Sequence, residues 1–256
     1  MVSAVSNLSG TGGNERFNKE AAAWDSRPFV HEASQGAAEA ILRKCIALSV
    51  SPQQVLEIGC GTGILSFLIA PHVERLVAID AAEGMIEMLE QKLQKPGAPK
   101  NIVPVAVLLE DPEDASLPPA DPAKPNGQRQ KFDLITSHLV LHHIPDLKAV
   151  LETMFGCLTL GGRVMLTDFQ DFGSEAKRFH PASKLGGVER HGIRITDMTA
   201  SMKEVGFKHV EVRAEWTMSK KVERFDGEFG DSGGPPRDDA GEMMNFPFVL
   251  CYGEKL

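Results

Sequence analysis

A glycine turn flanked by two acidic residues is the part of this chain best suited to hold a ligand. Residues 55–63 read VLEIGCGTG, an apolar run typical of a buried strand that leads into Gly59, Gly61 and Gly63. A strand followed by such a turn brings bare backbone against a ligand at its carboxyl end. Asp80 ends the next apolar run, LVAID, 21 residues after Gly59. This is close to the spacing of about 20 residues at which an acid reaches ribose hydroxyls, so the pattern predicts a nucleoside site.

The glycine spacing narrows the choice of nucleoside. A dinucleotide fingerprint, GxGxxG, needs a third glycine where this chain has Ile64, and its helix start receives a pyrophosphate. Glu57, two residues before the first glycine, would add negative charge beside that pyrophosphate and suits a cationic amino acid better. Two plainer explanations remain open: the glycines can serve turn geometry alone, and Asp80 can be a helix N-cap.

This stretch resembles the first motif, hhExGxGxG, of class I S-adenosylmethionine (SAM) methyltransferases. The resemblance implies that Glu57 contacts or orients the methionine moiety while the glycine backbone approaches it. It also implies that Met85 packs against adenine and that an acid at 110–111 accepts a hydrogen bond from adenine N6. Pro112 departs from the family pattern, because proline has no N–H to meet adenine N1. The predicted cofactor contacts in and around this motif are Glu57, Gly59, Cys60, Gly61, Gly63, Asp80, Ala81, Met85, Glu110 and Asp111.

Later segments extend the resemblance over most of the chain, from Phe17 to Phe207. LHHIPD at 141–146 and the LTLGG segment at 158–162 look like later motifs of small-molecule SAM methyltransferases, the type that includes ubiquinone and menaquinone biosynthesis enzymes. FNKEAAAWDSRP at 17–28 resembles their lid helix, whose aromatic residues cover SAM, which adds Trp24 to the predicted contacts. At the end of the fourth predicted strand, Ser137 and His138 complete the set.

Histidines supply the chemistry that this transfer needs. Transfer from a sulfonium requires that nucleophile, methyl carbon and sulfur lie in line and that an O–H or S–H acceptor loses its proton. Histidine is the natural base near neutral pH. We expect His142 to be that base, oriented by Asp168 or Asp171 on the neighbouring strand end, with His191 as the second candidate; both histidines and Asp168 are the predicted catalytic residues. Capping and packing remain an alternative explanation for His142, His143 and Asp168.

Alternating apolar runs and amphipathic segments predict the elements that position these residues, as in an α/β doubly wound sheet. Strands are expected at 54–58, 75–79, 102–109, 132–137, 162–168, 208–218 and 246–253. Helices are expected from Phe17, over 31–48, and at 63–70, 83–94, 146–157 and 196–205, with a loop-rich stretch at 170–194. The resemblance implies a Rossmann-like seven-stranded sheet of order 3-2-1-4-5-7-6 with helices on both faces and an N-terminal helical lid.

Composition sets the expected organisation. With 256 residues, 42% of them hydrophobic, the chain can bury one α/β core, so we expect a single domain at 15–256 with lid helices at 15–49. The Gly/Ser/Asn-rich segment 1–14 is predicted to be disordered. Two stretches rich in turn formers, 111–131 and 225–242, are predicted to be surface insertions, and either could close over a substrate.

Charge and apolar patterning exclude several partners. The net charge of −8, without a basic block, argues against nucleic acid. No apolar run reaches the roughly 18 residues of a membrane span, and we expect a cytoplasmic protein. The four cysteines, Cys45, Cys60, Cys157 and Cys251, are far apart and fit no metal or redox spacing; we expect reduced, mostly buried thiols and no metal site.

The leading hypothesis is a SAM-dependent methyltransferase that acts on a small organic acceptor, with oxygen or sulfur slightly favoured over nitrogen or carbon. One alternative is a non-catalytic SAM-binding regulatory subunit. A less favoured one is an NAD-type oxidoreductase, which Ile64 and Glu57 argue against. The sequence predicts neither the acceptor nor the oligomeric state.

Overall fold

The computed structural model describes residues 11–230 and 239–256. Its strands form one seven-stranded sheet of order β3-β2-β1-β4-β5-β7-β6, which confirms the predicted fold and strand order. The five strands β1 to β5 all run parallel to one another. β7 lies between β5 and β6 and is antiparallel to both. The strands are β1 (Gln54–Ile58), β2 (Arg75–Asp80), β3 (Ile102–Ala106), β4 (Phe132–His138), β5 (Leu158–Phe169), β6 (Lys208–Val222) and β7 (Glu242–Glu254).

Helices cover both faces of this sheet, as predicted. They are α1 (Thr11–Trp24), α2 (Pro28–Leu48), α3 (Ile64–Ile69), α4 (Glu83–Leu93), α5 (Leu147–Cys157) and α6 (Ile195–Val205), with short 3-10 turns η1 (Ala70–His72), η2 (Leu141–His143), η3 (Ser174–Phe179) and η4 (Ala182–Lys184). α2 begins three residues before its predicted start because Pro28 stands at its first position, where proline's fixed φ favours a helix and its missing N–H costs nothing.

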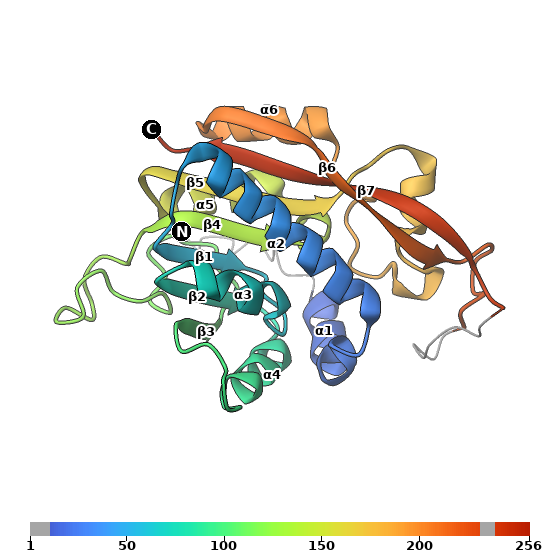
Figure 1. Cartoon of the computed structure of the whole chain (residues 1–256), viewed down its shortest axis with the longest axis horizontal. Helices are drawn as coiled ribbons and strands as arrows, with labels where there is room; N and C mark the ends of the chain where they lie inside the picture. Colours follow the sequence, from blue (N-terminus) through green and yellow to red (C-terminus); the bar gives the residue numbers. More distant parts are fainter. Residues whose placement is uncertain (1–10, 231–238) are drawn as a thin grey trace, which may run out of the picture.

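Side chains alternate between two apolar layers, one on each face of the sheet. Ile41 of α2, Leu65 of α3 and Leu89 of α4 pack with one set of strand residues, and Met154 of α5 and Met202 of α6 pack with the other. Figure 1 shows α2 crossing the strands on its face of the sheet. The parallel strands are buried on both faces, which explains why their sequences are continuous apolar runs.

Four strands differ clearly from their predicted lengths, and each difference has a local cause. β3 ends at Ala106 rather than at residue 109, because the chain leaves the sheet after Val107 N–H bonds Asp80 O. β5 begins at Leu158, since the LTLGG segment pairs with Phe132 of β4 instead of forming a separate turn. β6 and β7 are longer than expected because they continue pairing as a hairpin out to Val222 and Glu242.

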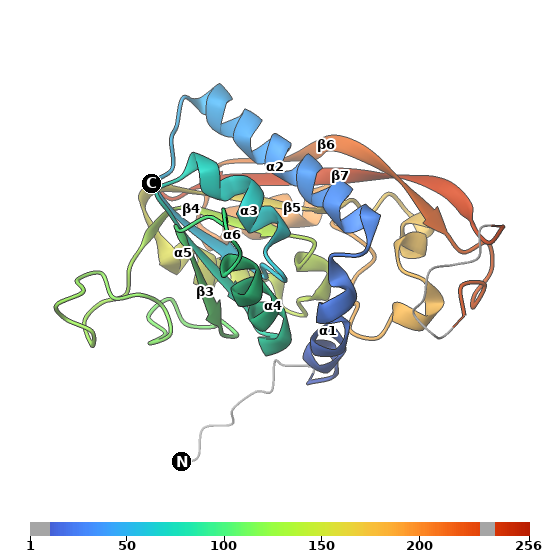
Figure 2. The same cartoon turned by 60° about the horizontal axis from the view of Figure 1, so that its bottom comes forward.

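That hairpin extends beyond the rest of the sheet (Figures 1 and 2). Its far end packs on α2 and η3 through Phe179, Met218, Val222 and Phe246. The predicted insertion at 225–242 is the connection at its tip; residues 225–230 continue from β6, residues 231–238 lie outside the described part, and Glu242 already belongs to β7.

The other predicted irregular segments are also more structured than expected. Thr11–Asn14, part of the stretch predicted to be disordered, lies in α1, whereas residues 1–10 are outside the described residues. The 111–131 insertion is mostly exposed, but Leu117 is buried in the core. Arg129 is buried too, and its guanidinium donates to the carbonyls of Leu117, Pro125 and Gly127.

Two expectations from composition can be compared with the structure. Cys45, Cys60, Cys157 and Cys251 are all buried and free, as predicted. Among the helices of the described ranges, none combines the length and apolar character needed to span a bilayer.

Candidate functional site

The glycine turn after β1 brings backbone against open space. Gly59 has φ +72°, and a Cβ there would lie 2.3 Å from Cγ2 of Val140, so the turn after β4 packs directly on it. Gly61 has φ +54°, and a Cβ there would meet no atom within 4 Å. The first glycine therefore permits close packing, while the second leaves a bare backbone position facing a cavity.

Asp80 joins this turn to the end of β2. One carboxylate oxygen accepts from Gly61 N–H and the other from Ala82 N–H, both at 2.8 Å. Burial raises the pKa of Asp80, and these two backbone donors oppose the shift. Asp80 is not the N-cap of α4, which is Ala82; its carboxylate instead holds the backbone just before the helix and lines the cavity.

Glu57 is a buried carboxyl group beneath the turn. It is 2% exposed and accepts a hydrogen bond from Ser66 Oγ of α3 at 2.5 Å. Burial raises its pKa to about 8, the Ser66 hydrogen bond opposes that shift, and the neighbouring Asp80 charge adds to it. Two carboxyl groups with raised pKa values at one end of a cavity favour a cationic ligand over a pyrophosphate.

A cavity of about 830 Å³ opens at the carboxyl ends of the parallel strands, within the range of about 300–1,000 Å³ typical of ligand sites. Most of the predicted site residues line it. They are Trp24, Glu57, Gly59, Cys60, Gly61, Asp80, Ala81, Met85, Glu110, His138 and His142. Pro112 also lines the cavity, where proline would offer no N–H to an adenine ring.

Five predicted site residues are not among the lining residues. Gly63 is buried at the start of α3, where a Cβ would lie 2.5 Å from Cδ1 of Leu89. Asp111 is exposed and accepts from Glu113 N–H. Ser137 is fully buried within β4. Asp168 lies behind His142, and His191 is exposed on the 170–194 segment.

The ends of β4 and β5 bring His142 onto Asp168. Leu139 adopts a positive φ of 55°, uncommon for a residue with a branched side chain, and the chain turns there into η2. His142 Nδ1 lies 2.9 and 3.0 Å from the two oxygens of Asp168, and His142 N–H donates to the same carboxylate. Both side chains are buried, and Nε2 of His142 is buried without a hydrogen-bond partner. An Nδ1–H donated to Asp168 leaves a lone pair on Nε2.

Two further histidines lie near this pair. His138 Nδ1 is 2.9 Å from Thr167 Oγ1, and burial lowers its pKa to about 4. His143 Nδ1 is 2.7 Å from Gly187 O, and burial, followed by the proximity of His142, lowers its pKa to about 3. Both line the cavity, but only His138 was among the predicted contacts.

The lid presents its aromatic residues to the cavity, as predicted, and is held down by polar contacts that no sequence pattern indicated. Phe17 and Trp24 of α1 line the cavity, their rings 5.8 Å apart in an edge-to-face arrangement. Asp25, directly after α1, accepts from Thr62 Oγ1 of the glycine turn at 2.5 Å and from Lys92 Nζ of α4 at 2.7 Å. Figure 2 shows α1 beside α4. Asp25 and Thr62 had no signal in the sequence because residues 37 positions apart in the chain meet there.

Arg16 ties the same helix to the other side of the cavity. Its guanidinium donates to the carbonyls of Lys184 and Gly186, both at 2.8 Å, in the loop-rich stretch that contains η4. The lid therefore bridges the glycine turn and the 170–194 segment.

Comparisons with known proteins agree with this geometry. Residues 29–212 match the family model described as a methyltransferase domain. An uncharacterised methyltransferase from Schizosaccharomyces pombe is 26% identical over 63% of this chain and 56% of its own length. A ubiquinone biosynthesis O-methyltransferase from Coxiella burnetii is 21% identical over 68% of this chain and 75% of its own length.

Solved structures show the same architecture. The crystal structure of a SAM-dependent methyltransferase from Clostridium acetobutylicum aligns with a TM-score of 0.56 over 93% of this chain and 98% of that one, at 14% identity. At this identity the similarity concerns the fold.

Proposed function

Since the chain belongs to the methyltransferase family, whose class I fold uses SAM as methyl donor, we propose that it methylates oxygen or sulfur of a small organic acceptor. The observation that carries this proposal is one continuous cavity of about 830 Å³, lined by Gly61 and Asp80 as well as by His142. Nitrogen and carbon acceptors are less favoured, because a buried histidine–carboxylate pair suits the removal of a proton from a hydroxyl or thiol.

The glycine-turn end is assigned to the cofactor. Gly61 leaves room for close approach of the ligand, Asp80 would accept hydrogen bonds from the ribose hydroxyls, and Glu57 would face the cationic methionine moiety. Met85 and Glu110 line the part of the cavity assigned to adenine. When bound, SAM supplies a methyl carbon whose bond to the positively charged sulfur breaks with the electron pair left on sulfur.

The η2 end is assigned to the acceptor. His142 Nε2 would take the proton of the acceptor's O–H or S–H bond, and the electron pair of that bond would form the new bond to the methyl carbon. Asp168 holds the ring through Nδ1 and stabilises the imidazolium that results. Trp24 and Phe17 of the lid would exclude water.

Apolar walls support a small acceptor with an apolar body. Phe29, Leu139 and Phe179 line this part of the cavity, and the ubiquinone biosynthesis O-methyltransferase among the relatives is consistent with oxygen as the accepting atom. We place the reaction in the cytoplasm, a proposal supported by the four free, buried cysteines.

Ligand binding and turnover test the proposal together. Calorimetry should show that SAM and S-adenosylhomocysteine bind and that NAD does not. A panel of phenols, thiols, amines and carboxylates with labelled SAM should then give a labelled methyl ether from a phenol or a labelled methyl thioether from a thiol. Tight NAD binding would overturn the assignment, and SAM binding without transfer to any acceptor class would favour the non-catalytic regulatory alternative.

Asp80→Ala tests whether this carboxylate contributes to SAM binding. Loss of the carboxylate should weaken SAM binding by about 1–3 kcal/mol, since ribose hydroxyls would lose their buried partner. Asp121→Ala, an exposed aspartate of the 111–131 loop, is the matched control. An unchanged SAM affinity in the Asp80 variant, measured by calorimetry, would reject this role.

A further inference from the structure

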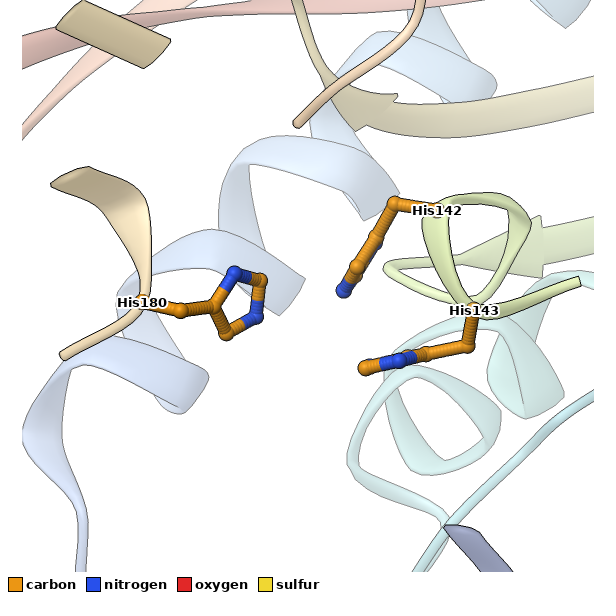
Figure 3. A group of neighbouring side chains, drawn as sticks. All are labelled: His142, His143 and His180. Carbon is orange, nitrogen blue, oxygen red and sulfur yellow. The ribbon is translucent and has the colours of Figure 1, made fainter. Parts of the chain in front are cut away.

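Three imidazole rings converge beside the acceptor end of the cavity. His142 and His143 come from η2, and His180 follows η3. One ring nitrogen from each forms a set in which all lie within 4.8 Å of one another. Figure 3 shows His180 on one side of a shared gap and His142 and His143 on the other.

Hydrogen bonds orient two of these rings so that a lone pair faces the gap. His142 Nδ1 bonds Asp168 and His143 Nδ1 bonds Gly187 O. Each Nδ1–H donated in this way leaves Nε2 as an acceptor. A carboxylate or a backbone carbonyl on the far nitrogen is the arrangement that surrounds histidines bound to metal ions.

Polar atoms left without partners point to a missing ligand. His142 Nε2 and His180 Nδ1 are buried and have no hydrogen-bond partner. Buried polar atoms are nearly always satisfied, so such atoms in one small space call for an ion or water between them.

We propose that His142, His143 and His180 bind a divalent transition-metal ion of the zinc class. Imidazole nitrogen is a preferred ligand of zinc, copper, iron and nickel, whereas magnesium and calcium prefer oxygen. Nitrogens around a tetrahedral zinc ion lie roughly 3.3 Å apart. The three ring nitrogens lie at most 4.8 Å apart in the structure. Each pair therefore needs to close by no more than about 1.5 Å to bind one ion.

Three protein ligands leave one coordination position open, as in zinc sites that bind a water or a substrate. His142 and His143 line the cavity, so this position faces the acceptor. An ion bound to Nε2 of His142 takes up the lone pair that would otherwise accept the proton. In that state the ion would instead lower the pKa of the acceptor's O–H or S–H group, and the proton would pass to solvent water as the oxygen or sulfur completes the coordination. Only this last step depends on the proposed function, and the metal site itself does not.

No metal site was expected from the sequence, because the four cysteines fit no metal spacing; the three histidines lie too far apart in the chain to form a local motif. His180 lies 37 positions after His143 in the chain, and only the packing of η3 against the end of β5 brings it close. The stacked rings of Phe169 and Phe179, 4.0 Å apart, hold that segment in place.

Zinc titration of the chelator-treated full chain tests the site directly. Wild type should bind one equivalent of Zn²⁺ by calorimetry, and Co²⁺ in its place should give the strong visible absorption of a four-coordinate ion. His180→Phe removes a ligand but keeps an aromatic ring among Phe169 and Phe179. His180→Phe should weaken zinc binding by about 100-fold or more. Loss of a residue that only hydrogen-bonds to a metal ligand costs about 10- to 100-fold, and loss of the ligand itself should cost at least the upper value. His72→Ala, an exposed histidine at the end of η1, should bind zinc as wild type does.

Further variants keep the test decisive. Asp168→Asn should weaken zinc binding by about 10- to 100-fold through misorientation of His142, and His143→Phe should repeat the loss seen for His180→Phe. SAM binding reports folding of the His180 variant, since His180 is not among the residues that line the cavity. Absence of a one-to-one complex in wild type, or zinc affinity in His180→Phe or His143→Phe equal to that of wild type, would overturn the proposal. Failure of SAM binding with intact zinc binding would instead overturn the proposed function.

Discussion

Protonation of the Glu57 carboxyl should depend on whether a cationic ligand occupies the adjoining cavity. Its pKa of about 8 means that the carboxyl is largely protonated at pH 7 in the absence of ligand. Because the folded protein binds this proton more tightly than the unfolded chain does, the raised pKa adds to the free energy of unfolding of the ligand-free protein. This contribution is complete below the unfolded pKa of about 4.3 and is lost as the pH rises through 8. A cation placed beside Glu57 favours the charged carboxylate and reverses the shift.

We therefore expect SAM binding at pH 7 to release up to one proton. SAM affinity should rise with pH and level off above pH 8, where Glu57 is already ionised. Calorimetry in buffers of different ionisation enthalpy measures the released proton directly. Glu57→Gln, which keeps the shape of the side chain, should bind SAM more weakly and with no buffer dependence. A wild-type binding enthalpy that is the same in all buffers would contradict this coupling.

His142 is the residue whose loss should affect turnover more than binding. His142→Ala should lower methyl transfer by about 100-fold or more, the contribution typical of a general base. SAM affinity should remain, because the ring lies at the acceptor end. Single-turnover rates and calorimetry on the same preparation separate the two effects. His209→Ala, an exposed histidine paired with Glu254, is the control, and full activity of the His142 variant would remove this residue from the reaction.

Among the elements, α1 covers the cavity and is attached on both sides of it. Asp25 is hydrogen-bonded to both the glycine turn and α4, and Arg16 reaches the 170–194 segment. Burial alone would raise the pKa of Asp25, but its bonds to Lys92 and Thr62 lower it, so the carboxylate keeps both partners at neutral pH. These attachments are made by side chains at the edge of the cavity, the kind of contact that opens locally.

Asp25→Ala should loosen this lid without disturbing the sheet. Hydrogen bonds to charged groups contribute about 1.5–3 kcal/mol when buried. Asp25 is partly exposed, so we expect a smaller loss of about 1 kcal/mol in SAM affinity, seen as faster dissociation in stopped-flow measurements. Ser26, the residue after Asp25, makes only a local hydrogen bond from its hydroxyl to Ala23 O. Ser26→Ala should therefore leave the rate of SAM dissociation unchanged. Equal dissociation rates in the two variants would show that Asp25 does not hold the lid.

The sequence predicted the elements that follow a repeating pattern better than those that depend on distant contacts. β1 was predicted to the residue, because its apolar run ends at a glycine. The continuation of the β6–β7 hairpin to Val222 was missed, since its residues are stabilised by pairing across the strands and by packing on Phe179. In the same way the pairing of His142 with Asp168 followed from neighbouring strand ends, whereas the approach of His180 did not.

Across the whole molecule, Lys220 connects three separate parts of the chain. This residue of the hairpin extension donates to Phe179 O of η3, and its ammonium group lies 4.4 Å from the ring centroid of Phe29 in α2. Burial lowers the pKa of Lys220 to about 7, and the positive charges of Lys184 and Arg27 add to that shift. The unfolded chain, in which lysine titrates near 10.4, therefore holds more protons than the folded one between pH 7 and 10.

The free energy of unfolding should consequently rise with pH over this interval. One proton of difference corresponds to a slope of about 1.4 kcal/mol per pH unit. Lys220→Met removes the titrating group and should flatten the profile, whereas Lys208→Met, at the exposed start of β6, should retain it. Urea unfolding at several pH values provides the measurement. Parallel profiles for wild type and Lys220→Met would contradict the assignment.

The continuity of the cavity also determines what kind of inhibitor this fold should accept. Because the glycine turn and the η2 histidines open into the same space of about 830 Å³, one covalent molecule can occupy both ends at once. Adenosine joined by a short linker to an acceptor-like group would make its second contact intramolecularly, at an effective concentration in the millimolar range. Such a bisubstrate compound should bind more tightly than either half, provided that the linker spans the distance between the two ends.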